Sequence, residues 1–271
     1  MRPVVLLIIT ALFCLGFNSL AQTCNQDLIL FLLNAEHELS EEGVPFLKPL
    51  PANNDKEMDV EAFISTGTSI KEEPFAYYSY NDSHQLINQC VHSLSQQEEM
   101  FCWSYVYEGR ALPIEMEYGS SVQRESVYSG GFSIEDEMIH LVNYKMGDTL
   151  TFEKGMDLSS GKSLSYGDVT FNYLSKSKAE MSIEDYHWEF TFGSNHEILG
   201  FHKWDSSAHE LDENWSFNYN SRGLVTNVTL HNSAGKLIEN WRITYDTSGR
   251  MTQQINAVNG TKLTYSYQEI Y

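Results

Sequence analysis

The stretch Trp215-Ser216-Phe217-Asn218-Tyr219, followed by Asn220-Ser221-Arg222-Gly223, determines the expected fold of this chain. Its aromatic residues alternate with small or polar residues, a period of two that is typical of a β-strand with one buried face. An Asn at the first position of a tight turn can accept a backbone N–H, and a Gly at the fourth position supplies a positive φ. The stretch therefore predicts a strand, a tight turn and a return strand.

The same pattern recurs at steps of 26 and 27 residues, with related copies elsewhere. The alternating stretches are residues 188–192, 215–219, 241–245 and 263–267, with upstream copies at 103–107 and 78–80. Turns of the form Asn/Asp-x-x-Gly begin at Asn220, Asn232 and Asp246, and Asn81 begins a similar turn with His84 at the glycine position. Each unit is expected to form two antiparallel strands and two tight turns.

These units predict an all-β fold, an antiparallel meander of repeated β-hairpins, over residues 61–271. Residues 119–178 keep a less regular alternation and are expected to be stranded as well. Residues 22–60 are expected to hold a short N-terminal helix and a loop. Within them, residues 25–42 place five apolar side chains at helical spacing: Leu28, Phe31, Leu32, Ala35 and Leu39.

Residues 1–21 have the features of a signal peptide. An apolar run of 14 residues follows Arg2, and the small residues Ser19 and Ala21 fit the positions before a cleavage site. The run is shorter than the roughly 20 residues that a membrane-spanning helix needs. We therefore expect export to the periplasm, the cell surface or the extracellular space, with no transmembrane segment in the mature chain.

The composition is acidic and rich in aromatic residues. The 271 residues include 37 Asp and Glu against 17 Lys and Arg, a net charge of −20, and 13% are aromatic. Without Arg2, 16 basic residues remain against 37 acidic ones, a net charge of −21. The aromatic content argues against disorder, and the negative charge argues against nucleic acid as a partner.

Residues 243–252, Ile-Thr-Tyr-Asp-Thr-Ser-Gly-Arg-Met-Thr, with Gly260 and the strand at 265–267, resemble one unit of the YD-repeat (Rhs-type) family. Residues 217–224 are a second match, with Asn220 in place of the Asp. The resemblance covers residues 188–267 and, loosely, 77–112. It implies a sheet built by hairpin repetition, and large relatives enclose toxins or bind carbohydrate and other partners at cell surfaces. A short exported chain of this kind is similar to small secreted proteins of Bacteroidetes.

Cysteine and histidine residues provide further candidate sites. Cys90 and Cys102 are 12 residues apart in two strand-like stretches, a spacing that fits either a hairpin disulfide or two reduced thiols. His187, His202 and His209 can meet across neighbouring strands, although histidine on a solvated face is the ordinary expectation. No spacing typical of a zinc or calcium site occurs, so we expect neither a metal nor a cofactor.

The strand residues Trp215, Phe217, Tyr219, Trp241 and Tyr245 are expected to lie side by side on one face. Burial in the core is the expected role, because a sheet without a buried face does not fold alone. The alternative is an exposed platform that stacks on sugar rings or holds a partner. We expect a structural or binding protein, not an enzyme, whose partner is a protein or a glycan. The alternative function is a polysaccharide hydrolase that uses a pair of carboxylates.

Overall fold

The computed structural model describes most of the chain from residue 47 onwards. The described ranges are residues 47–52, 56–67, 71–92, 100–110, 113–120, 126–135, 138–143, 149–153, 163–166, 169–175, 177–183, 185–194, 197–206 and 213–270. The predicted signal peptide, the predicted helix at 25–42, Cys24 and His209 lie outside these ranges. Within them, no helix has the length and apolar character needed to cross a membrane.

The described residues form eighteen strands, so the predicted all-β antiparallel meander is confirmed. In chain order the strands are β1 (Met58–Ser65), β2 (Glu73–Tyr80), β3 (Leu86–His92), β4 (Met100–Val106), β5 (Glu115–Ser120), β6 (Ser126–Glu135), β7 (Met138–Asn143), β8 (Thr149–Glu153), β9 (Ser163–Tyr166), β10 (Val169–Ser175), β11 (Lys178–Ile183), β12 (Tyr186–Phe192), β13 (Ile198–Asp205), β14 (Glu213–Tyr219), β15 (Val225–Asn232), β16 (Leu237–Tyr245), β17 (Met251–Asn256) and β18 (Lys262–Glu269).

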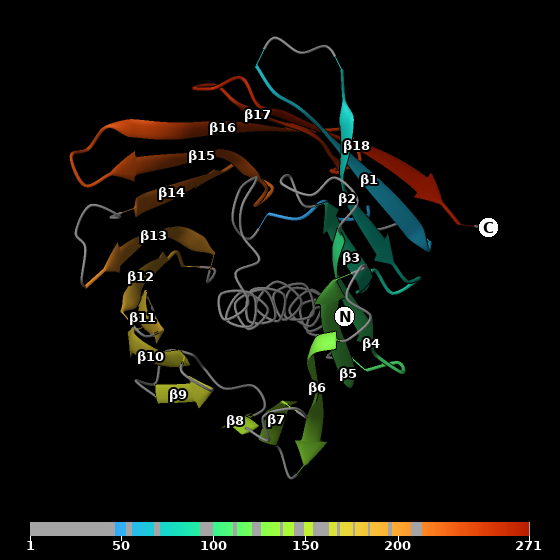
Figure 1. The fold of residues 1–271 in the computed structure, drawn as a ribbon, viewed down its shortest axis with the longest axis vertical. Helices are drawn as coiled ribbons and strands as arrows, with labels where there is room; N and C mark the ends of the chain where they lie inside the picture. The colour runs from blue at the N-terminus through green and yellow to red at the C-terminus, as the bar shows by residue number, and fades with distance from the viewer. Residues whose placement is uncertain are drawn as a thin grey trace, which may run out of the picture.

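The sheet curls into a ring, which Figure 1 shows in a view through its centre. Each strand pairs antiparallel with the next from β1 to β8 and from β9 to β18, and β8 lies beside β9. The first strand also pairs with the last, from Met58 opposite Glu269 to Ser65 opposite Lys262. The ring therefore has an inner face, an outer face and two rims at which the turns lie.

The inner face carries the hydrophobic core, because alternate residues of each strand point to the same side. The buried pairs predicted by the repeat all lie there: Trp188 and Phe190, Trp215 and Phe217, and Trp241 and Ile243. Rings of neighbouring strands contact one another, with centroids 5.6 Å apart for Phe190 and Phe201 and 5.8 Å apart for Phe201 and Trp215. Each aromatic pair of this kind contributes about 0.5–1.5 kcal/mol beyond its buried area.

The tight turns have the geometry that the Asn/Asp-x-x-Gly pattern predicts. In the turn after β14, the side chain of Asn220 accepts hydrogen bonds from the backbone N–H groups of Arg222 and Leu224. Gly223 adopts a φ of 75°, and Gly235 and Gly249 in the equivalent turns adopt φ values of 74° and 93°. In the turn after β2, His84 takes the same conformation with a φ of 59°. The turn pattern therefore imposes its backbone geometry even where the glycine is absent.

A tyrosine fastens each of three strand pairs near these turns. The hydroxyl of Tyr219 donates to the carbonyl of Ile198 at 2.7 Å, and that of Tyr245 donates to the carbonyl of Val225 at 2.8 Å. Tyr267 donates to the carbonyl of Met251 in the same way, at 2.8 Å. In each case the acceptor is the first residue of the preceding strand. Each tyrosine therefore holds the end of its own strand against the turn from which the preceding strand starts.

The fourth residue of each turn adopts a left-handed backbone conformation, which predicts opposite effects on stability for two substitutions. We expect His84→Gly to raise the free energy of unfolding by about 1 kcal/mol, because an L side chain at positive φ costs roughly that much. We expect Gly223→Ala to lower it by about the same amount, since no atom lies within 4 Å of the added Cβ and only the backbone conformation is penalised. Urea unfolding of both variants tests this, and the same sign for both contradicts it.

The tyrosine hydroxyls predict a loss of stability in alkali. Burial raises the pKa of Tyr245 to about 12, whereas an unfolded tyrosine ionises near pH 10. The folded state therefore holds its proton more tightly, and the stability contributed is complete below pH 10 and is lost as the pH rises towards 12. We expect the free energy of unfolding to fall over this range, and to fall less steeply in Tyr245→Phe. Equal slopes in both proteins contradict the prediction.

Candidate functional site

The predicted aromatic row lies on the inner face of β14 and β16. Trp215, Phe217 and Trp241 are buried, with 8%, 6% and 3% of their surface exposed. Tyr219 and Tyr245, at the ends of these strands, are half-buried. A binding platform requires rings exposed in a row, so these residues have the role of core residues.

The polar atoms of these rings are satisfied within the chain. Nε1 of Trp215 donates to Oε2 of Glu213 at 2.9 Å, and Nε1 of Trp241 donates to Glu239. In both cases the carboxylate precedes the tryptophan by two residues, within the sequence Glu-Asn-Trp at 213–215 and 239–241. The repeat therefore carries its own acceptor for each of these buried indoles, a feature that the strand and turn pattern alone did not reveal.

The outer face of β12 and β13 carries a different aromatic group, the indole of Trp204 stacked on two imidazoles. His187 lies opposite Trp204 across the strand pair, with ring centroids 5.4 Å apart and an interplanar angle of 25°. His202, two residues before Trp204 on β13, has its centroid 4.8 Å from the indole at an angle of 29°. All three side chains are half-buried. The indole is therefore held in place by its neighbours while part of it remains exposed.

Polar side chains continue this group across the outer face. His202 lies opposite Asn214 on β14, and Asn214 lies opposite His231 on β15. Asn214 is exposed and His231 is half-buried. Here the outer-face strip denotes His187, His202, Trp204, Asn214 and His231.

Carboxylates lie on the β11 side of the outer-face strip. Glu189 on β12 lies opposite His202 and also opposite Glu180 on β11. Oε1 of Glu189 is 2.8 Å from Nζ of Lys178, and this hydrogen bond raises the pKa of the lysine ammonium. The pairing partly neutralises Glu189, and Glu180 adds a second carboxylate on this side of the Trp204 indole.

The outer-face strip combines a flat aromatic surface with uncharged hydrogen-bonding groups. An indole offers an apolar face and an N–H at its edge. A neutral imidazole offers one donor and one acceptor, and a carboxamide offers both. This set suits a ligand that presents an apolar face and several hydroxyl groups, as a sugar ring does.

The structure brings together only two of the three histidines expected to meet. His187 and His202 lie on neighbouring strands and both contact Trp204, whereas His209 lies outside the described ranges. Among the residues that the structure describes, no three His, Cys, Asp or Glu side chains are grouped so as to hold a metal ion. The chemistry of this cluster is therefore that of stacking and hydrogen bonding.

Trp204 is the residue that the sequence reasoning missed. Trp204 is not one of the tryptophans of the repeat. Phe201 and Lys203 lie on the inner face of β13, and Trp204 lies on the opposite, polar face. A large aromatic residue on the polar face of a strand, next to His202, is the signal that could have identified it. Such a residue contributes less to the core than the buried tryptophans of the inner face do.

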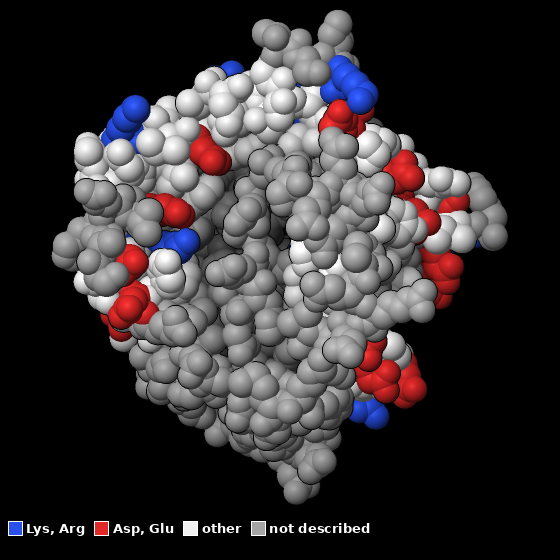
Figure 2. All heavy atoms as spheres, viewed as in Figure 1, with Lys and Arg blue, Asp and Glu red and all other residues white. Residues whose placement is uncertain are grey.

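Acidic side chains lie on the rim of the ring that Figure 2 shows. Figure 2 shows Asp and Glu side chains on both sides of the rim that faces the viewer, with fewer Lys and Arg side chains among them. This distribution agrees with the net charge of −20 for the whole chain. An anionic ligand that approaches the ring is therefore repelled before it makes contact.

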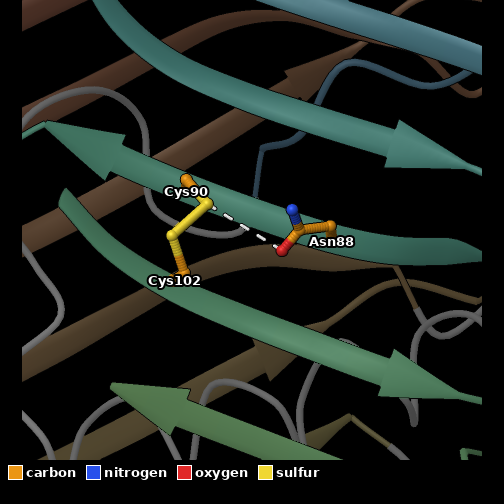
Figure 3. The surroundings of a disulfide bond; sticks show 3 residues. All are labelled: Asn88, Cys90 and Cys102. Atoms are coloured by element: carbon orange, nitrogen blue, oxygen red, sulfur yellow. Dashed lines mark hydrogen bonds between the residues drawn. A yellow bond between two sulfur atoms is a disulfide. The ribbon is translucent and has the colours of Figure 1, made fainter. Parts of the chain in front are cut away.

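The two candidate cysteines form a disulfide that joins β3 and β4 (Figure 3). Cys90 and Cys102 are directly opposite each other in the strand register, with Cα atoms 4.1 Å apart. The Sγ of Cys90 also lies 3.8 Å from Oδ1 of Asn88. The bond closes the β3–β4 hairpin on the outer face, because the adjacent Gln89 and Trp103 form the inward-facing pair.

The length of the closed loop predicts the stability that the disulfide provides. Residues 90–102 form a loop of about 13 residues, for which the chain-entropy model gives roughly 3 kcal/mol. We expect the double substitution Cys90→Ala, Cys102→Ala to lower the free energy of unfolding by about that amount. Urea unfolding with and without a reductant measures this, and the double variant should be insensitive to the reductant. A wild-type curve that the reductant leaves unchanged contradicts the prediction.

No protein-family model matches the chain, and no curated protein matches it. Among solved structures, it is similar to a porin-like protein from Bacteroides uniformis at 9% identity and a TM-score of 0.30, covering 80% of this chain and 99% of that one. A DUF1329 family protein from Desulfovibrio piger gives 9% identity and a TM-score of 0.24, covering 80% and 85%. A LolA superfamily protein from Nitrosomonas europaea gives 12% and 0.23, covering 81% and 87%. Likenesses this distant carry no argument about function, which is inferred below from the residues of the chain.

Proposed function

We propose that this chain is an exported, non-enzymatic binding protein that holds a glycan on the outer face of its sheet. The observation that carries the proposal is the half-buried indole of Trp204, which stacks against the imidazoles of His187 and His202. A sugar ring packs its C–H face on the exposed part of the indole. The His187 imidazole and the Asn214 carboxamide then bond to its hydroxyl groups.

The rigidity of the site supports this proposal. His187 and Trp204 belong to two strands that are paired along most of their length, from Tyr186 opposite Asp205 onwards. Side chains that are already ordered by packing lose little conformational entropy when a ligand binds. An indole that is already stacked on a paired sheet therefore loses little conformational entropy when it binds a ligand.

The uncharged character of the outer-face strip favours a glycan over a charged partner. Its five side chains carry no formal charge at neutral pH with histidine counted as neutral. A docking surface for a charged protein gains its specificity from complementary charges, which these residues do not supply. Hydroxyl groups, by contrast, pair with the neutral donors and acceptors that are present.

A hydrolase acting on polysaccharide is the second candidate, and one observation favours it. Glu180 and Glu189 lie directly opposite each other on the outer face of β11 and β12, where Cβ atoms are about 4.5–5.5 Å apart. Two carboxyl groups at a similar separation serve retaining glycosidases. However, Lys178 pairs with Glu189, and the convex outer face leaves a bound sugar open to water. Binding without hydrolysis is therefore the function we favour.

The proposal also includes a relation to the YD-repeat family and export of the chain. The turn at residues 246–250 supports the resemblance, because Asp246 accepts the N–H of Arg250 and Gly249 adopts the positive φ for which the motif provides a glycine. The disulfide between Cys90 and Cys102 supports export, since disulfides persist in oxidising compartments. A carbohydrate-binding role outside the cytoplasm is consistent with both.

Glycan binding by the mature chain, measured on a glycan array and then by calorimetry, tests the proposal. We expect Trp204→Ala to weaken binding at least fivefold, because loss of one stacking ring costs about 1–3 kcal/mol. Ser266→Ala, an exposed substitution on the outer face of β18, is the matched control and should leave binding unchanged. Equal affinities for the wild type and Trp204→Ala contradict the proposal. Release of new reducing ends from a bound polysaccharide favours the hydrolase instead.

A further inference from the structure

A carboxylate lies beside the Trp204 indole on the outer face of β12 and β13. Glu189 is directly opposite His202, as His187 is opposite Trp204. The two pairs are two residues apart along each strand, so all four side chains project from the same face. Glu189 is therefore the diagonal neighbour of Trp204, with Cα atoms about 7–8 Å apart. A sugar ring stacked on the indole can reach this carboxylate with one of its substituents.

The next strand adds a second carboxylate. Glu180 on β11 is half-buried and lies directly opposite Glu189, and like charges in that position repel each other. Lys178 compensates for one of the two charges, because its Nζ is 2.8 Å from Oε1 of Glu189. Among the residues that the structure describes, none forms a hydrogen bond or an ion pair with the Glu180 carboxylate. These three side chains therefore leave one negative charge beside the indole.

The ion pair of Lys178 does not prevent a second cation from binding. The side chains of Lys178 and Glu189 are 51% and 39% exposed, and an ion pair between such exposed groups is weak and easily exchanged. The whole chain, with a net charge of −20, attracts cations and repels anions. An ammonium group that approaches Glu180 and Glu189 is thus attracted both by the molecule and by the local charge.

We infer that the bound glycan contains amino sugars, with one ring stacked on Trp204 and its ammonium group bound by Glu180 and Glu189. This inference rests on the proposed function and deepens it, because the outer-face strip supplies the partners of the hydroxyl groups and the adjacent carboxylates bind the amine. Hydrogen bonds from an ammonium to a carboxylate are roughly twice as strong as those between uncharged groups. The C–H groups next to an ammonium carry partial positive charge, which the negative face of the indole attracts.

Other ligands compensate the charge of these carboxylates less well. A uronide would bring a third carboxylate to the two already present, and an N-acetylated sugar has lost the positive charge of its amine. A divalent cation needs several ligands, and no three His, Cys, Asp or Glu side chains in the described part of the chain are grouped to provide them. A single positive charge that also donates hydrogen bonds, as a protonated amine does, meets the requirement.

Three β-1,4-linked trisaccharides of equal length test the inference: those of glucosamine, N-acetylglucosamine and glucose. Calorimetry at pH 7 and low salt measures their affinities for the mature chain. We expect the glucosamine trisaccharide to bind about tenfold more tightly than the other two, because only its protonated amines form charge-assisted hydrogen bonds. This preference should shrink at high salt, since interactions between exposed charges are screened.

Substitutions of the carboxylates separate this inference from the proposed function. The double variant Glu180→Gln, Glu189→Gln removes both charges and keeps the shape of the side chains. We expect it to reduce the preference for glucosamine to about twofold or less and to bind the glucose trisaccharide as the wild type does. Glu117→Gln, an exposed substitution on the outer face of β5, is the matched control and should leave the preference unchanged. Trp204→Ala should weaken binding of all three trisaccharides.

Each outcome has a definite meaning, provided that circular dichroism verifies the fold of each variant. Equal affinities for the three trisaccharides, or a glucosamine preference that the double variant retains, overturn the inference, while sensitivity to Trp204→Ala upholds the proposed function. A glycan array on which only sugars without amines bind also overturns the inference alone. An array without any bound glycan overturns both.

Discussion

The hydrogen bond from a strand-end tyrosine to the first carbonyl of the preceding strand is the interaction on which this fold depends. Tyr219, Tyr245 and Tyr267 each make it, at 2.7–2.8 Å. A tyrosine whose ring is packed against the core must satisfy its hydroxyl inside the protein, and the carbonyl beside each turn is the acceptor within reach. This requirement fixes where each hairpin turns relative to its neighbour. Repeated three times between β13 and β18, it aligns these strands in a regular sheet.

The same requirement separates the two faces of the ring. Aromatic rings with an acceptor on their own strand, such as Trp215 with Glu213 and Trp241 with Glu239, can be buried on the inner face. Trp204 lies on the outer face of β13, where the imidazoles of His187 and His202 cover only part of its indole. The side chains of the inner face therefore stabilise the fold. A change of side chain on the outer face costs the core little.

Much of the fold could be predicted from the sequence, because period-two alternation and turn chemistry are local properties. The turn at Asn81 illustrates this, since His84 takes the left-handed conformation that the motif assigns to glycine. The site could not be predicted, because it depends on which residues become cross-strand neighbours. His187 and Trp204 are 17 residues apart and meet only through the register of β12 and β13. Closure of the ring by β1 and β18 is non-local for the same reason.

Closure also limits how this protein can recognise a partner. A sheet with free edges can bind an extended peptide by adding it as a further strand, with backbone groups supplying the affinity. Here β1 and β18, the strands at the two ends of the described sheet, use their backbone groups to pair with each other over eight residues. Recognition at that junction must therefore come from side chains that project from the sheet.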